Sequence, residues 1–194
     1  MDAAAPDPGP STRDRIVAAA LAGFARRGVE ATSLDDVALA VGVRKQTVLY
    51  WFRSKDALVS GVVEAAVDEL GRSLEAAVAG RRPGRDARVA VVDEVLRLGA
   101  RRPDLLVLLR EVTRLGPSAT ATLGDAIAPR LDGAARALAG PGGDVDRARH
   151  RLLEAGARVI ATAVEAELRT QMQVPPTRAW LRSRRADLLA VLTS

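Results

Sequence analysis

Basic and polar side chains with the chemistry to recognise nucleic-acid bases are concentrated in one short stretch of the chain. It runs from Arg44 to Lys55 with four basic residues and no acidic one, and it holds the only two lysines of the sequence. Arginine and lysine donate hydrogen bonds to the O6 and N7 acceptors of guanine, and glutamine pairs with adenine. We therefore expect Arg44, Lys45 and Gln46 to face base edges.

Hydroxyl, aromatic and cationic side chains close to these three residues are suited to the phosphate backbone. Such contacts fix the register of a protein on a duplex without reading its sequence. A helix N-terminus adds backbone N–H groups and the positive end of the helix dipole, which Ser33 would aim at a phosphate. The expected phosphate contacts are Ser33, Thr47, Tyr50, Trp51 and Lys55.

Three short helical segments must position these side chains. Ser11 and Ser33 are N-cap residues followed by aspartates in the first turn, and Gly28 and Gly42 end the two segments that they begin. A third segment runs over residues 44–52. The last two segments are too short to be stable alone, so the first must supply the third wall of a small core.

The turn between the second and third segments has the residue types of a helix-turn-helix. A small residue, Ala38, allows the helices to cross closely, and Gly42 permits the backbone angle of the turn. The core is expected to include Val37, Val43, Val48, Phe24 and Phe52. An ordinary helical corner without a DNA role is the alternative, and the basic stretch favours DNA binding.

Beyond Ser54 the sequence predicts a larger helical region. Apolar residues recur at helical spacing from Ser54 to Gly80, and amphipathic stretches follow, one of which, 118–138, should be kinked by Pro129. No alternating pattern predicts a strand. We expect an all-α chain of about nine helices, with a disordered tail over 1–10, a helix-turn-helix DNA-binding domain over 11–55 and, joined by the long helix, a larger domain over 56–194.

Composition excludes several classes of function. The chain has no cysteine and one histidine, His150, and it lacks phosphate-binding glycine loops, so we expect no metal, no cofactor and no enzymatic activity. A formal net charge of +5 favours a polyanionic partner. No apolar run is long enough for a bilayer and no secretory signal is evident, which predicts a cytoplasmic protein.

The N-terminal part of the sequence resembles the TetR family of tetracycline-repressor-like regulators. The resemblance covers residues 12–60 and is carried by ATSLDDVA at 31–38 and GVRKQTVLYWFRSKDAL at 42–58. It implies three N-terminal helices that bind DNA, a fourth that links them to a larger helical domain for a small-molecule inducer, and a homodimer. Such a regulator is usually a repressor, released from a palindromic operator by its inducer.

Matched by position, the residues of this chain agree with the family's contacts apart from two departures. Thr47, Tyr50 or Trp51, and Lys55 match its phosphate contacts, and Arg44, Lys45 and Gln46 match its base-facing residues. Leu49 stands where a tyrosine is most common, which shifts one phosphate contact to Tyr50 or removes it. Gln46 replaces a glycine or proline, which adds a base contact and alters operator preference. A helical interaction module that does not bind DNA specifically is the alternative.

Two apolar stripes on the segment 144–172 predict a dimer. A surface helix that packs on one core needs a single stripe, so the second points to a helix of a partner chain. A buried central helix is the alternative. The expected interface residues are Leu152, Val159, Ala163, Trp180, Leu188 and Leu192.

Polar residues on otherwise apolar helices are the candidates for an inducer pocket. They are Arg110, Thr113, Arg114, Glu165 and Arg169. Apolar walls with one or two arginines would suit a hydrophobic anion. The alternative for each residue is an exposed charge on a solvated helix face.

Overall fold

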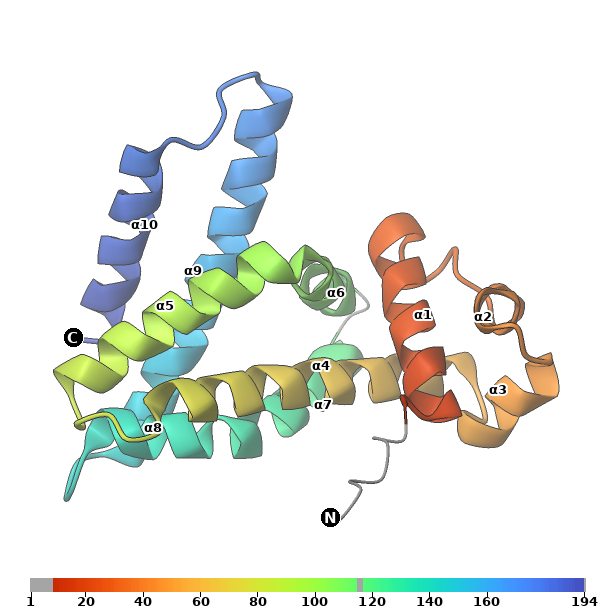
Figure 1. Ribbon diagram of the computed structural model, residues 1–194, viewed down its shortest axis with the longest axis horizontal. Coiled ribbons are helices and arrows are strands. Elements are labelled where there is room, and N and C mark those ends of the chain that lie inside the picture. The colour runs from red at the N-terminus through yellow and green to blue at the C-terminus, as the bar shows by residue number, and fades with distance from the viewer. Residues whose placement is uncertain (1–8, 115–116, 194) are drawn as a thin grey trace, which may run out of the picture. The chain divides into compact units, whose positions relative to one another are not determined.

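The computed structural model of the chain is entirely helical over the residues it describes, 9–114 and 117–193, with only the backbone described at 113 and 117–122 (Figure 1). Ten helices and no strand lie in these ranges. They are α1 (Thr12–Arg27), α2 (Leu34–Val41), α3 (Lys45–Trp51), α4 (Lys55–Val78), α5 (Arg85–Arg101), α6 (Pro103–Arg114), α7 (Pro117–Arg130), α8 (Asp132–Ala139), α9 (Val145–Gln171) and α10 (Arg178–Val191). The all-α prediction is confirmed, and residues 1–8 of the expected tail lie outside the described ranges.

The chain divides into two compact units, residues 1–65 and 66–194. The boundary falls inside α4, so this helix begins in the first unit and ends in the second. None of the described helices combines the length and the apolarity that crossing a bilayer requires.

Serine capping boxes set the starts of α1 and α2. Ser11 Oγ accepts a hydrogen bond from the backbone N–H of Asp14 at 3.2 Å, and the Asp14 carboxylate accepts one from the backbone N–H of Ser11. Ser33 and Asp36 repeat the arrangement at 3.1 and 2.8 Å. These bonds satisfy N–H groups that a helix start leaves unpaired. The helix starts predicted at both serines are confirmed.

The core of the 1–65 unit joins all three short helices to the first half of α4. Phe24 and Phe52 are buried, as predicted, at 1% and 4% exposure. Gly61 of α4 lies so close to the Phe52 ring that a Cβ atom there would collide with it. The other buried apolar residues include Ile16, Ala20, Val37, Val48, Leu58 and Val62.

The core of the 66–194 unit is built from leucine, valine and alanine side chains on five helices. Its members from α4, α5 and α8 are Leu74, Ala87, Val91, Val92, Ala134, Ala135 and Leu138, with Leu131 just before α8. Those from α9 and α10, and the residue after α10, are Ala148, Leu152, Ala155, Val159, Leu188, Val191 and Leu192.

The segment 118–138 differs from its prediction as a single kinked helix. The structure has two helices here, and α7 continues through Pro129 and ends at Arg130. Leu131 separates them, with its N–H bonded to Ile127 O and backbone angles near the edge of the helical region. Because proline removes one helical hydrogen bond and crowds the preceding turn, the break follows it directly.

Ion pairs far apart in sequence join the helices of the 66–194 unit. Arg102 contacts Glu69 of α4 at 2.5 Å and Asp104 of α6 at 3.0 Å. The hydrogen bond with Asp104 is the largest cause of the raised pKa of the Arg102 guanidinium. Arg130 of α7 binds Asp68 of α4 at 2.5 Å. The second half of α4 is therefore held to the helices around it by its own carboxylates.

Candidate nucleic-acid interface

The turn between α2 and α3 is tight and is made by Gly42. Its backbone is left-handed, with φ 75° and ψ 35°, a conformation that glycine adopts without steric cost. The N–H groups of Gly42 and Val43 return to the carbonyls of Leu39 and Ala38 at 3.2 and 3.0 Å. The chain then takes an extended conformation at Arg44, and α3 begins at Lys45. The predicted helix-turn-helix is therefore present.

Helix α3 has one buried side and one exposed side. Val48 is fully buried and anchors the helix to the core, whereas Arg44, Lys45 and Gln46 are exposed at its start. Thr47 is half-buried between the two sides. The three side chains predicted to face bases thus lie together in water at one end of a helix that the core holds in place.

Lys45 is held by an acidic residue of α2. Its Nζ lies 2.8 Å from Oδ2 of Asp35, and both side chains are about half exposed, at 46% and 64%. An exposed pair of this kind contributes about 0–1 kcal/mol. Lys45 can therefore exchange Asp35 for a stronger acceptor at small cost.

The aromatic residues of α3 divide between solvent and core. Tyr50 is 78% exposed and Trp51 42% exposed, and their rings meet edge to face with centroids 5.3 Å apart. Phe52 packs inward under the guanidinium of Arg13, 5.4 Å from the ring centroid. Tyr50 and Trp51 are available to a ligand.

Ser33 and Lys55, two expected phosphate contacts, are already bonded within the chain. The Ser33 hydroxyl donates to Asp36 at 2.7 Å, and its backbone N–H and hydroxyl, together with Arg27, hold the pKa of the Asp36 carboxyl below its ordinary value. Lys55 Nζ donates to the backbone carbonyl of Glu30 at 2.7 Å. A phosphate at the start of α2 would meet the Asp36 carboxylate, whereas Lys55 keeps two further donors.

The five candidates for an inducer pocket fall into two groups on α6 and α9. Arg110 and Arg114 pair with Glu111 on α6, and the side chain of Thr113 lies outside the described part of the structure. Glu165 and Arg169 pair with each other on α9 at 3.0 Å. Trp180 Nε1 of α10 donates to Glu165 at 2.7 Å and is the main cause of the lowered pKa of Glu165.

Most of the expected interface residues are buried within the chain itself. Leu152, Val159, Leu188 and Leu192 belong to the core of the 66–194 unit, while Ala163 and Trp180 are half-buried. A side chain covered by its own chain has little area left for a partner, so assigning these four leucine and valine residues to a dimer interface does not fit the structure. The exposed apolar residues of α9 include Leu153, Val164 and Leu168, which belong to its other stripe, and α10 adds the exposed Leu181.

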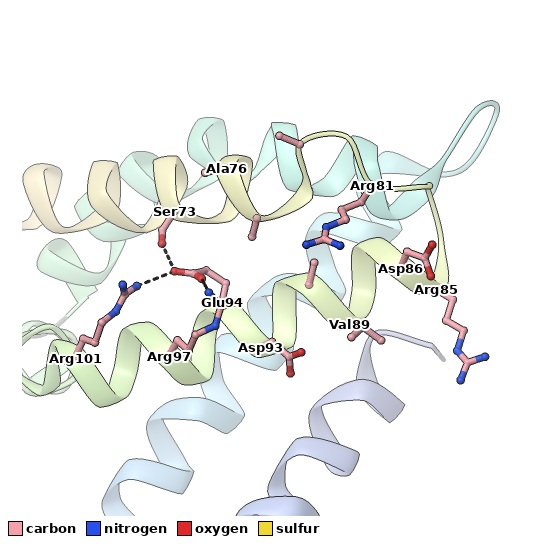
Figure 2. Close-up of a pocket in the computed structure, with 13 residues that line it drawn as sticks. Ser73, Ala76, Arg81, Arg85, Asp86, Val89, Asp93, Glu94, Arg97 and Arg101 are labelled. Carbon is pink, nitrogen blue, oxygen red and sulfur yellow. Dashed lines mark hydrogen bonds and ion pairs between the residues drawn. The ribbon is translucent and has the colours of Figure 1, made fainter.

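A groove between α4 and α5 was not anticipated from the sequence. It encloses about 790 Å³ and contains the buried carboxylate of Glu94 (Figure 2). Glu94 lies three residues after Val91 and four before Leu98, so it occupies the apolar stripe of α5. A charged residue at a position where the helical pattern calls for an apolar one was the sequence feature that could have revealed this groove.

Among the described residues, no group of acidic and histidine side chains is arranged to hold a metal ion.

A comparison with protein families finds a match within the first unit. The family described as bacterial regulatory proteins, tetR family, matches residues 16–62. A search of curated proteins finds no match to the chain.

Solved structures with the same fold cover both units. A transcriptional regulator from Rhodococcus sp. Rha1 is 22% identical with a TM-score of 0.70, covering 94% of this chain and 96% of its own. A TetR transcriptional regulator from Legionella pneumophila is 18% identical with a TM-score of 0.69, covering 94% and 97%. FadR from Bacillus subtilis, in complex with stearoyl-CoA, is 16% identical with a TM-score of 0.70, covering 93% and 97%. The matched segment contains α2, α3 and the glycine turn between them, so residues 16–62 are similar to the tetR family of bacterial regulatory proteins.

Proposed function

We propose that the chain is a homodimeric, ligand-responsive repressor that binds a palindromic DNA operator and is released by a small-molecule inducer. The observation that carries this proposal is the start of α3, where Arg44, Lys45 and Gln46 are exposed on a helix anchored by the buried Val48. We assign the protein to the cytoplasm and assign it no enzymatic activity.

In this proposal α3 lies in the major groove with its first residues at base edges. Arg44 contacts guanine, Lys45 leaves Asp35 for a base acceptor, and Gln46 pairs with adenine. The duplex is held in register by Thr47, Tyr50, Trp51 and Lys55, and by the N-terminus of α2 at Ser33. Leu49 stands where the family most often has a tyrosine, and the exposure of Tyr50 supports the proposal that Tyr50 makes this phosphate contact instead.

The dimer is proposed to form through the exposed stripe of α9 together with α10. Leu153 and Leu168 of α9 are 47% and 57% exposed, and Leu181 of α10 is 50% exposed. An apolar face of this kind gains free energy when a partner covers it. Ala163 and Trp180 are half-buried beside this stripe and would be at its margin. Two-fold symmetry then matches a palindromic site.

Release is proposed to act through α4, because this helix belongs to both units. An inducer bound in the 66–194 unit would favour a conformer in which the two α3 helices no longer match the half-site spacing. The contacts of Asp68 with Arg130, and of Glu69 with Arg102, support this role of α4. The complex of FadR from Bacillus subtilis with stearoyl-CoA supports a small-molecule ligand for this chain.

Selection of bound sites from a random oligonucleotide pool, followed by titration of the selected duplex at several salt concentrations, tests the proposal. We expect a palindromic site. With six to eight phosphate contacts in the dimer, affinity should fall about a thousandfold or more between 50 and 200 mM salt. A flat salt response with no enriched sequence would instead identify a helical interaction module.

A further inference from the structure

The groove between α4 and α5 has the size of a ligand site and lies in the 66–194 unit. Its volume of about 790 Å³ is within the range of small-molecule pockets. Figure 2 shows the groove running between the two antiparallel helices, with arginine side chains at both ends and no large side chain between them.

One end of the groove is organised by Glu94. Its carboxylate, 7% exposed, accepts from Ser73 Oγ at 2.5 Å and pairs with Arg97 at 2.6 Å and Arg101 at 3.0 Å. The two arginine side chains remain about 60% exposed, at 61% and 62%. One carboxylate balances one of the two guanidinium charges, so a single positive charge at this end stays uncompensated.

The other end is formed by the loop between α4 and α5. Arg81 extends from this loop into the space between the helices, whereas Arg85 points away from it (Figure 2). The side chain of Arg81 forms no hydrogen bond or ion pair with any other described residue, whereas its backbone N–H donates to the carbonyl of Val78. Asp86 is the acidic residue of the lining at this end, and its carboxylate forms no ion pair with Arg81.

Small apolar residues form the floor between the two ends. They are Ala76, Ala77, Ala79, Val89 and Ala90. Asp93, a further acid of the lining, points to α10 and is bound by Arg185 at 2.7 Å. Glu94 follows Asp86 by eight positions, which places these two residues, one near each end of the groove, about 12 Å apart along the helix.

The geometry points to a binding site for an elongated organic dicarboxylate, with one carboxylate at Arg81 and the other at Arg97 and Arg101. At the Glu94 end one positive charge is in excess, and at the loop end the Arg81 guanidinium has no carboxylate partner among the described residues, so each end suits a singly charged carboxylate. Guanidinium groups bind carboxylates through paired, charge-assisted hydrogen bonds. The alanine floor accommodates a methylene chain. This inference rests on the proposed function, because it names the chemical class of the ligand to which the regulator responds.

Calorimetry of the full-length protein with sebacate, decanoate and succinate tests the site. Sebacate has an extended length of the same order as the distance between the ends. Decanoate has the same chain with one carboxylate, and succinate is too short. We expect sebacate to bind about tenfold more tightly than either, because each charged hydrogen-bonded end is worth at least this factor.

Two arginine variants on the same loop and helix start provide a matched pair. Arg81→Ala should weaken sebacate binding about tenfold and leave decanoate binding unchanged. Arg85→Ala removes an equal charge whose side chain points away from the groove, so it should leave both affinities unchanged. Equal losses in the two variants, equal affinities for sebacate and decanoate, or no detectable binding of sebacate would overturn the inference.

Thermal unfolding and DNA binding separate this inference from the rest of the proposal. Arg81 is exposed in a loop, and an unchanged melting temperature of Arg81→Ala confirms that its effect is local. Sebacate binding with the expected Arg81 dependence, in a protein that binds no selected DNA, would overturn the regulator and leave the site standing. DNA binding without sebacate binding would overturn the site and leave the regulator standing.

Discussion

The two units of the chain are stabilised by different kinds of interaction. The 1–65 unit has large side chains at its centre, such as Phe24 and Phe52, and its first two helices begin with capping boxes of four residues each. The 66–194 unit has a buried core of leucine, alanine and valine with no aromatic residue, and its helices are joined by arginine–carboxylate pairs such as Arg185–Asp93. The first unit is organised by local signals, and the second by contacts between residues far apart in sequence.

This difference suits the two proposed roles. A reading helix must keep its geometry within narrow limits, which a packed aromatic core and short turns provide. A ligand-responsive unit needs alternative arrangements that differ little in free energy, and partly exposed ion pairs can be exchanged at a cost of about 1 kcal/mol or less.

The largest effect is expected from Phe52→Ala in the first unit. Removing a buried phenylalanine leaves a cavity under Gly61 and Arg13, and such changes cost about 3–5 kcal/mol. Hydrogen exchange measured by mass spectrometry should show loss of protection in α1–α3, with α8 and α9 still protected. Tyr50→Ala, at a residue 78% exposed, is the control and should change stability by about 0.5 kcal/mol or less. Equal loss of protection in both units would contradict the view that the two units are stabilised separately.

DNA recognition gives the next largest effect. Arg44→Ala should lower affinity for the selected operator by roughly ten- to hundredfold, because a bidentate contact with guanine is worth about 1–3 kcal/mol. Affinity for random duplex should change much less. Arg53→Ala removes the same charge from the end of the reading segment and serves as the control in fluorescence anisotropy titrations. If both variants weaken operator and random duplex equally, Arg44 contacts phosphate and reads no base.

The second unit is tested by Arg102→Ala. This change breaks the link from Glu69 of α4 to Asp104 of α6, and it should cost about 1–2 kcal/mol, discounted because all three side chains are about one-third exposed. Urea unfolding measures the loss, with Arg82→Ala in the exposed α4–α5 loop as the control. A loss of stability as large as that of Phe52→Ala would show that ion pairs stabilise the 66–194 unit as strongly as aromatic packing stabilises the 1–65 unit.

The same contrast decides what could be predicted from the sequence. The starts of α1 and α2 and the turn at Gly42 were predictable because a serine, an aspartate and a glycine specify them within a few residues. The two stripes of α9 were also visible, but which stripe faces the chain's own core depends on α5, α8 and α10. Leu152 and Val159 were therefore assigned to a partner although they pack inside.

The groove between α4 and α5 was unpredictable for a related reason. Its arginines come from a loop and from the far end of α5, and only folding brings Ser73 of α4 to Glu94 of α5. The break between α7 and α8 was predicted only as a kink, because proline signals a weakened helix without specifying whether it continues.

The smallest effect concerns the pH dependence of the cap on α2. Hydrogen bonds from the Ser33 backbone and hydroxyl lower the pKa of Asp36 in the folded chain, whereas in the unfolded chain this pKa returns to about 3.9. A carboxyl with a depressed folded-state pKa stabilises the fold above its unfolded value, and this contribution is lost as pH falls through the folded value. The protection of α2 amides, measured relative to their intrinsic exchange rates, should therefore fall below about pH 4 in the native protein, and Asp36→Asn should remove this dependence. Ser33→Ala keeps the backbone donor and loses the hydroxyl, so part of the dependence should remain. If Asp36→Asn leaves the acid profile of α2 unchanged, the capping box contributes geometry and no pH-dependent stability, and the local signals of the first unit would act through steric fit alone.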